Sequence, residues 1–166
     1  HNHNARHNHA AANKKAGVLI GNKAPDISIL SLPDNRKFSL YDIKSPFTVL
    51  YFWDPDCGHC KKQTPDVISF YEKYKDKGVK LVAICTKLNT DAEKECLSSI
   101  KEKKGMEIFT NAYDPFLRSR YKQKYDIRST PRIFILDENK TILMKGIAGK
   151  KLAEVMDYLM KDREKS

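Results

Sequence analysis

The sequence contains no long hydrophobic run and few of the residues that build metal sites or linkers. No stretch approaches the roughly 18 consecutive apolar residues of a membrane-spanning helix. There are only four cysteines, and His59 is the only histidine beyond residue 16, whereas a structural zinc site uses four Cys or His ligands. No internal repeat and no Gly/Ser/Pro-rich linker follow residue 24. These absences argue against a membrane span, a zinc-dependent fold and a second domain.

The composition is that of a soluble globular domain. Apolar residues make up 40% of the 166 residues and charged residues 31%, which is enough apolar content for one packed core. The formal charge is +10, but residues 1–23 hold four basic residues and no acidic ones. The other lysines are scattered among acids on helix-like stretches, which is typical of solvated helix faces. We therefore expect no nucleic-acid partner; a basic face for nucleic acid is the alternative.

Residues 1–16 read HNHNARHNHAAANKKA and hold four of the five histidines. We interpret them as an affinity tag with a linker, and a natural metal-binding tract is the alternative. The predicted folded domain spans residues 17–166. A tag at this place leaves room for a signal peptide, a lipid anchor or another domain upstream in the natural protein.

Hydrophobic periodicity predicts strands that alternate with helices. The runs FTVLYFW (Phe47–Trp53) and VKLVAIC (Val79–Cys85) are continuous and rich in β-branched or aromatic residues, which is typical of strands covered on both faces. Two hairpins are predicted, at residues 27–30 with 37–40 and at residues 133–136 with 141–145. Helices are predicted at residues 60–77, 90–104, 114–124 and 151–161. This order predicts an α/β sandwich with a mixed sheet.

Local signals place the ends of several helices. Thr90 and Glu93 have the spacing of a capping box. Asp114 followed by Pro115 predicts an N-cap and a first-turn proline. Gly78 stands where the residue after a helix C-terminus is expected.

The segment WDPDCGHCKKQTP joins the strand Phe47–Trp53 to the helix that begins near Cys60. A cysteine at a helix N-terminus faces free backbone N–H groups and the positive end of the helix dipole, and both stabilise a thiolate. We therefore predict that Cys57 is the nucleophile of a redox pair and that the less accessible Cys60 resolves the mixed disulfide. A protonated His59 would lower the pKa of Cys57 further; a solvated spacer residue with little effect is the alternative.

Other roles for the cysteines have weaker support. Zinc binding needs further ligands, and Cys85 and Cys96 have no neighbouring ligand in the sequence. A purely structural Cys57–Cys60 disulfide would add little to a short strand-to-helix turn. We expect Cys85 and Cys96 to be buried thiols, and a second disulfide between them is the alternative.

The motif CGHC after an aromatic strand resembles the active site of the thioredoxin superfamily, with the spacer that is found in protein disulfide isomerases. Trp53, Pro65 and Gly146 match residues that the superfamily keeps, and Thr130-Pro131 resembles its cis-proline loop. The N-terminal hairpin and the extra helix and strand before Pro131 resemble the TlpA-like branch. This resemblance covers about residues 21–163.

The resemblance implies a thioredoxin-like three-layer sandwich: a mixed central sheet with helices on both faces, an N-terminal hairpin and a βα insertion before the cis-proline loop. Trp53, Thr130 and Pro131 are then substrate-binding residues, and Gly58 and His59 tune the reactive thiol. The implied activity is thiol–disulfide exchange with protein thiols and disulfides and with an upstream redox partner, which can be membrane-bound. No metal or organic cofactor is required. We expect a monomer that is periplasmic or otherwise exported, or membrane-tethered.

The sequence departs from the superfamily where a proton acceptor for Cys60 is expected. Tyr51 replaces the buried acid of thioredoxin, and Gln63 replaces a glutamate of several TlpA-like reductases. Asp54, Asp56 or a water molecule are the remaining candidates. TlpA-like proteins are typically reductants, whereas the CGHC spacer favours oxidation or isomerisation.

Two other activities share parts of this pattern. A peroxiredoxin-type peroxidase has a threonine three residues before its reactive cysteine, where this chain has Asp54. A copper(I) chaperone would use Cys57, His59 and Cys60, because soft thiolates suit that ion. Its relatives, however, separate their cysteines by three residues. Dithiol exchange is therefore the favoured hypothesis.

Overall fold

The two apolar runs of the sequence form the centre of a mixed sheet. In the computed structural model, which describes residues 18–165, β3 (Phe47–Trp53) and β4 (Val79–Cys85) pair in parallel over their whole length. Every residue of β3 is buried, as expected for a strand that is covered on both faces. The predicted tag at residues 1–16 lies outside the described residues.

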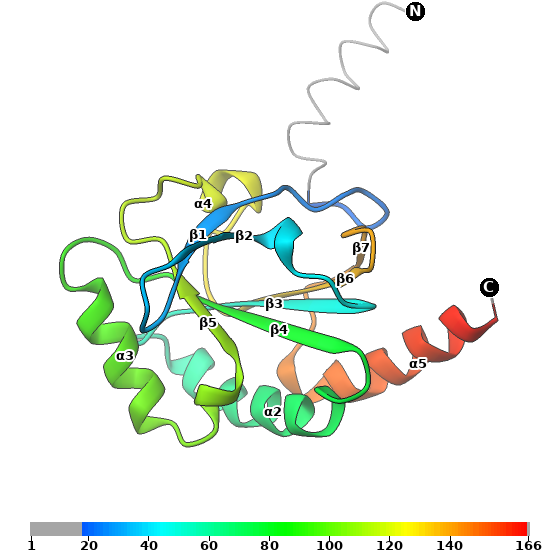
Figure 1. Cartoon of the computed structure of the whole chain (residues 1–166). Coiled ribbons are helices and arrows are strands. Elements are labelled where there is room, and N and C mark those ends of the chain that lie inside the picture. The colour runs from blue at the N-terminus through cyan, green and yellow to red at the C-terminus, as the bar shows by residue number, and fades with distance from the viewer. Residues whose placement is uncertain (1–17, 166) are drawn as a thin grey trace, which may run out of the picture.

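Five further strands extend this pair to a seven-stranded sheet with the order β2-β1-β5-β4-β3-β6-β7 (Figure 1). β5 (Thr110–Tyr113) is parallel to β4, and β6 (Arg132–Asp137) is antiparallel to β3. The outer strands are β1 (Ser28–Ser31), β2 (Lys37–Ser39) and β7 (Ile142–Lys145). The mixed sheet and both predicted hairpins are thereby confirmed.

Alternate residues of β3 pack on opposite faces of the sheet, as strand geometry requires. Val49 and Tyr51 belong to the core beneath the long helices, and Leu50 and Phe52 belong to the core on the other face. The first core contains residues of α2 (Gly58–Tyr74), α3 (Ala92–Glu102) and α5 (Leu152–Glu164), and the second contains Tyr121 of the one-turn α4 (Tyr121–Lys124). Figure 1 shows α2 and α5 on one side of the sheet and α4 on the other. The predicted three-layer sandwich is confirmed.

Residues 18–165 also contain three short 3-10 helices: η1 (Leu40–Asp42), η2 (Met106–Ile108) and η3 (Gly149–Lys151). Within residues 18–165, every helix is too short or too polar to cross a lipid bilayer.

The helix predicted at residues 114–124 is wrong over most of its length, because only α4 is helical there. The Asp114 carboxylate accepts hydrogen bonds from Arg118 N–H at 3.1 Å and from Ser119 N–H at 2.9 Å, and so closes a loop. Leu117 and Arg120 have positive φ values of 53° and 58°, which a right-handed helix does not allow. Asp114 and Pro115 thus form a loop that looks like a helix start in sequence.

The predicted capping box of Thr90 and Glu93 is also wrong. The N-cap of α3 is Asp91, and no side chain makes a capping hydrogen bond there. The prediction that Gly78 directly follows the helix C-terminus is wrong, because α2 ends at Tyr74 with Lys75 as its C-cap. Gly78 has a φ of +82° in the turn that follows, and a Cβ at this position would lie 3.0 Å from the Pro46 ring. Glycine is therefore needed in this turn for a different reason.

Candidate active site

Cys57 lies where the central strand ends and α2 begins. It is the N-cap of α2, and its Sγ accepts the backbone N–H of Cys60 at 3.1 Å. This is the place of an N-cap side chain, which pairs with N–H groups that the helix leaves free. The predicted position of Cys57 at a helix N-terminus is confirmed.

The two thiols of the CGHC motif have opposite pKa shifts. Partial burial by itself raises the pKa of Cys57, but hydrogen bonds from the Cys60 thiol, the Thr130 side chain and the backbone N–H groups of Cys60 and His59 outweigh it, so the pKa lies below the ordinary value. Burial and the shared hydrogen bond with Cys57 raise the pKa of Cys60 to about 12. Of the two thiols, Cys57 therefore loses its proton first.

The loop that carries Pro131 lies against Cys57. The Thr130-Pro131 peptide bond is cis, as predicted. The Cys57 thiol donates a hydrogen bond to the backbone oxygen of Thr130 at 3.4 Å. Two segments that are 73 residues apart in sequence thus meet at the sulfur.

The other predicted site residues surround this centre in different ways. Trp53 is buried at the end of β3 and lines a cavity of about 330 Å³ together with Cys60. Gly58 and His59 are exposed on the first turn of α2. His59 contributes to the lowered pKa of Cys57 through its backbone N–H and not through its imidazole.

Tyr51 and Gln63, which stand where the family resemblance led us to expect an acid, form other hydrogen bonds. The hydroxyl of Tyr51 forms a 2.7 Å hydrogen bond with Thr64, and burial raises the pKa of Tyr51. Tyr51 is thus neutral at physiological pH. The Gln63 side chain accepts the backbone N–H of Gly149 at 2.8 Å and so attaches α2 to η3. Neither residue offers a base to Cys60.

Asp54 and Asp56, the two acids before Cys57, lie in different environments. Asp54 lines the cavity beside Cys60 and accepts hydrogen bonds from Asp56 N–H at 2.8 Å and from the Thr86 hydroxyl at 3.3 Å. Asp56 is exposed and is paired with Lys87. Of the two candidates for the proton acceptor, Asp54 is the one that shares a cavity with Cys60.

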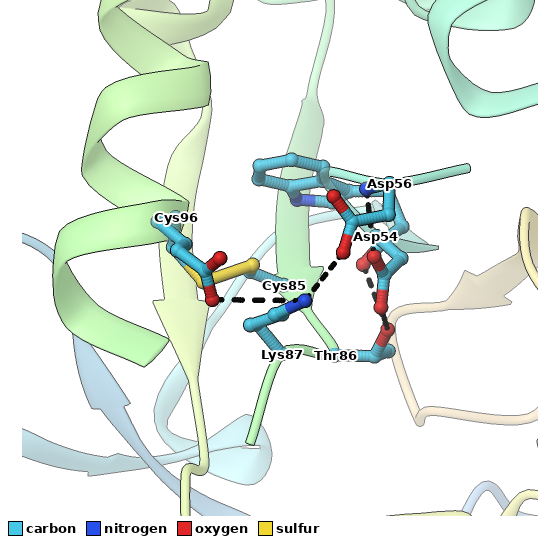
Figure 2. The surroundings of a disulfide bond; sticks show 8 residues. Asp54, Asp56, Cys85, Thr86, Lys87 and Cys96 are labelled. Carbon is cyan, nitrogen blue, oxygen red and sulfur yellow. Dashed lines mark hydrogen bonds and ion pairs between the residues drawn. A yellow bond between two sulfur atoms is a disulfide. The ribbon is translucent and has the colours of Figure 1, made fainter. Parts of the chain in front are cut away.

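Cys85 and Cys96 form a disulfide, which corrects the prediction of two buried thiols. Cys85 ends β4 and Cys96 lies on the buried side of α3, so their Cα atoms are 6.1 Å apart. That separation falls within the range of disulfides. Figure 2 shows this bond next to Lys87, Asp54 and Asp56. No sequence motif marks Lys87. Its place just after β4, at the sheet edge that also carries Cys57, was the available signal.

Among residues 18–165, no group of three or more His, Cys, Asp or Glu side chains is arranged to bind a metal ion. The free cysteines in the same residues are Cys57 and Cys60 of the CGHC motif.

The Redoxin family matches residues 19–159 of this sequence. The chain belongs to the Redoxin family. Thiol-disulfide oxidoreductase ResA of Bacillus cereus is 26% identical over 147 residues, which cover 89% of this chain and 80% of that protein. These matches make the chain a thiol–disulfide oxidoreductase of the TlpA-like and ResA-like thioredoxin superfamily, as the CGHC motif predicted.

Solved structures of this Redoxin protein's relatives have the same fold. A domain of a possible thiol-disulfide isomerase from Cytophaga hutchinsonii superposes with a TM-score of 0.79 at 30% identity, and the match covers 89% of this chain and 97% of that domain. The thioredoxin domain of a thiol-disulfide oxidoreductase from Bacteroides vulgatus gives a TM-score of 0.74 at 25% identity, and this match covers 84% and 96%.

Proposed function

We propose that Cys57 and Cys60 exchange electrons with protein dithiols and disulfides, with Cys57 as the nucleophile and Cys60 as the resolving thiol. The observation that carries this assignment is the position of the two thiols: Cys57 is the partly exposed N-cap of α2 and its sulfur accepts the Cys60 N–H, whereas Cys60 is buried. The opposite pKa shifts of the two thiols follow from this geometry. A thiolate is the attacking species in disulfide exchange, so the thiol with the lower pKa attacks first.

The exchange balances with sulfur chemistry alone. The Cys57 thiolate attacks one sulfur of a substrate disulfide, the substrate S–S bond breaks, and the leaving thiolate takes up a proton. Cys60 then gives up its proton and attacks the Cys57 sulfur of the mixed disulfide. The substrate leaves as a dithiol with two electrons, and the protein holds a Cys57–Cys60 disulfide. The reverse sequence oxidises a substrate dithiol, and no metal or organic cofactor enters either direction.

The substrate is proposed to bind as an extended segment along the Pro131 loop. The backbone oxygen of Thr130 lies 3.4 Å from the Cys57 sulfur, so a strand that pairs with Thr130 would bring its own sulfur to Cys57. Pro131 would then border the segment, whereas Trp53, which is buried at the end of β3, offers little surface to it. We expect the protein to act as a monomer and to be regenerated by an upstream redox partner.

The proposed place of action is an oxidising compartment outside the cytoplasm, with or without a membrane tether. The buried Cys85–Cys96 disulfide supports this proposal, because structural disulfides form and persist in oxidising compartments. Expression in the cytoplasm of a reducing host, followed by mass analysis under acid quench, tests it. We expect the Cys85–Cys96 bond to be absent there and present after periplasmic expression.

Insulin reduction tests the proposed exchange against copper binding. With dithiothreitol as the electron source, the protein should accelerate insulin precipitation at substoichiometric concentration. A copper(I) chaperone would instead take up one metal ion per chain and leave the rate of insulin reduction unchanged. Metal uptake without turnover would therefore overturn the proposal.

Cys57 is expected to be alkylated faster than Cys60 at neutral pH, because its pKa is lowered while that of Cys60 is raised to about 12. Brief treatment with iodoacetamide followed by peptide mass spectrometry checks this order. A Cys60→Ala variant is the matched control, since it should keep one fast-reacting thiol. Faster labelling of Cys60 in the wild-type protein would reverse the two roles.

His59→Pro is expected to make the protein more reducing. Proline lacks the backbone N–H that favours the Cys57 thiolate, and it is otherwise tolerated in the first turn of a helix. Loss of one hydrogen bond of about 1 kcal/mol corresponds to a potential that is about 20 mV more negative. Equilibration with glutathione measures the shift. His59→Ala keeps the N–H group, so its potential reports the imidazole alone, and an unchanged potential in His59→Pro would refute this role of the N–H.

A further inference from the structure

Lys87 connects the residue before the nucleophile to the helix that follows β4. Its ammonium group forms an ion pair with the Asp56 carboxylate and lies 3.6 Å from the Glu95 carboxylate of α3. Asp56 immediately precedes Cys57 in the sequence. Figure 2 shows Lys87 between Asp56 and the Cys85–Cys96 disulfide.

The backbone just before Lys87 is held by several contacts. Thr86 donates two hydrogen bonds to the backbone oxygen of Trp53, from its N–H at 2.8 Å and from its hydroxyl at 3.0 Å. The disulfide holds Cys85, two residues before Lys87, to Cys96, the residue that follows Glu95. Lys87 is half-buried, with 26% of its side chain exposed, whereas 72% of Asp56 is exposed. Lys87 is therefore the more enclosed partner of this pair.

The charges around the pair are unequal. Lys87 faces three carboxylates, those of Asp56, Asp54 and Glu95, and Asp56 faces Lys61 of α2 in addition to Lys87. The hydrogen bond with Lys87 lowers the pKa of Asp56, so this carboxylate is charged whenever Cys57 is a thiolate. A carboxylate beside a thiolate disfavours the thiolate.

We propose that Lys87 is a positioning residue for thiol–disulfide exchange: it holds the carboxylate of Asp56, the residue that precedes Cys57, and offsets its negative charge. The inference rests on the proposed function of Cys57. On this inference, the segment after β4 reduces the negative charge next to the nucleophile.

Lys87→Met tests this role through the pH profile of Cys57 alkylation. Without the lysine, the Asp56 charge is uncompensated, and the thiolate equilibrium of Cys57 should fall by about two- to fivefold, the scale of an exposed charge pair. The midpoint of the profile should then rise by about 0.3 to 0.7 pH units. Lys87→Arg keeps the charge and should keep the wild-type midpoint. Lys94→Met is the matched control, because it removes one positive charge from an exposed position on α3.

Two further measurements separate charge from packing. Adding Asp56→Asn to Lys87→Met removes the uncompensated carboxylate and should return the midpoint to the wild-type value. In about 1 M salt the difference between wild type and Lys87→Met should largely disappear, since the Debye length is about 3 Å there. A midpoint in Lys87→Met equal to that in Lys94→Met, a failed rescue by Asp56→Asn, or a shift that salt leaves unchanged would overturn the inference.

The outcome is distinguishable from a failure of the proposed function. The alkylation profile reports the Cys57 thiolate whether or not the protein reduces insulin. If wild-type protein reduces insulin and Lys87→Met leaves the profile unchanged, the exchange stands and the role of Lys87 falls. If the wild-type protein shows no turnover with any disulfide substrate, the proposed function itself falls.

Discussion

Cys57→Ser is expected to lower the rate of insulin reduction by about three orders of magnitude or more. This is the scale of loss when an enzyme loses its nucleophile. A serine hydroxyl cannot form the mixed disulfide, and Cys60, whose pKa is raised to about 12 and whose side chain is buried, cannot replace it. Cys60→Ala should also stop turnover, but after the first attack instead of before it. The Cys60→Ala protein should therefore accumulate as a covalent complex with a disulfide substrate.

Non-reducing electrophoresis after acid quench distinguishes the two variants. Cys60→Ala should give a band at the summed mass of protein and substrate that disappears with dithiothreitol, and Cys57→Ser should give none. Cys57 is partly exposed, so its replacement should leave the unfolding transition in place, and circular dichroism provides that control. A trapped complex in Cys57→Ser with none in Cys60→Ala would show that the nucleophile is Cys60.

The elements that the sequence predicts best are those whose local composition or periodicity is sufficient to define their structure. Phe47–Trp53 is apolar throughout, and a strand with that composition has to be covered on both faces; all seven residues are buried. Cys57 is found at the helix N-terminus because the apolar run ends at Trp53 and helical periodicity begins a few residues later. The reactive end of the site follows from these two local patterns.

The features that local sequence patterns do not reveal depend on contacts between distant segments. The family resemblance implied an extra strand before Pro131, but the residues did not locate it: β5, with the sequence TNAY, has no strong strand pattern, and it is a strand because β4 and β1 pair with it on either side. Asp114 and Pro115 carry a helix-start signal, but the Asp114 carboxylate closes a loop instead. The role of Gln63 becomes visible only when η3 is placed beside α2. Such contacts have no counterpart in the local periodicity of the chain.

Loss of the Cys85–Cys96 disulfide is expected to destabilise the fold by about 3 kcal/mol. The bond closes a loop with a sequence separation of 11, and the chain-entropy estimate for a loop of that length gives about 3 kcal/mol at 25 °C. The packing of α3 against the sheet depends strongly on this disulfide, because Ala92 and Cys96 are the only fully buried residues among the described residues of the helix. Loss of the bond should therefore increase local unfolding of α3 more than that of the other elements.

A background in which Cys57 and Cys60 are both replaced by Ala isolates this bond, since Cys85 and Cys96 are then the only cysteines of the chain. Guanidinium unfolding of that protein with and without dithiothreitol measures the effect of the cross-link while both sulfur atoms stay in the core. Hydrogen exchange should show the largest loss of protection in residues 92–102. Equal unfolding midpoints in the two conditions would show that packing alone holds α3 to the end of β4.

Cys85→Ala with Cys96→Ala should destabilise the same background further than reduction does. Reduction removes the cross-link alone, whereas the two substitutions also remove two buried sulfur atoms, and the space they leave adds an energetic cost. Both cysteines are fully buried, so the added loss is expected to be on the order of 1 kcal/mol for each site. Should the substituted protein instead match the reduced one, the sulfur atoms contribute to stability only through the bond between them.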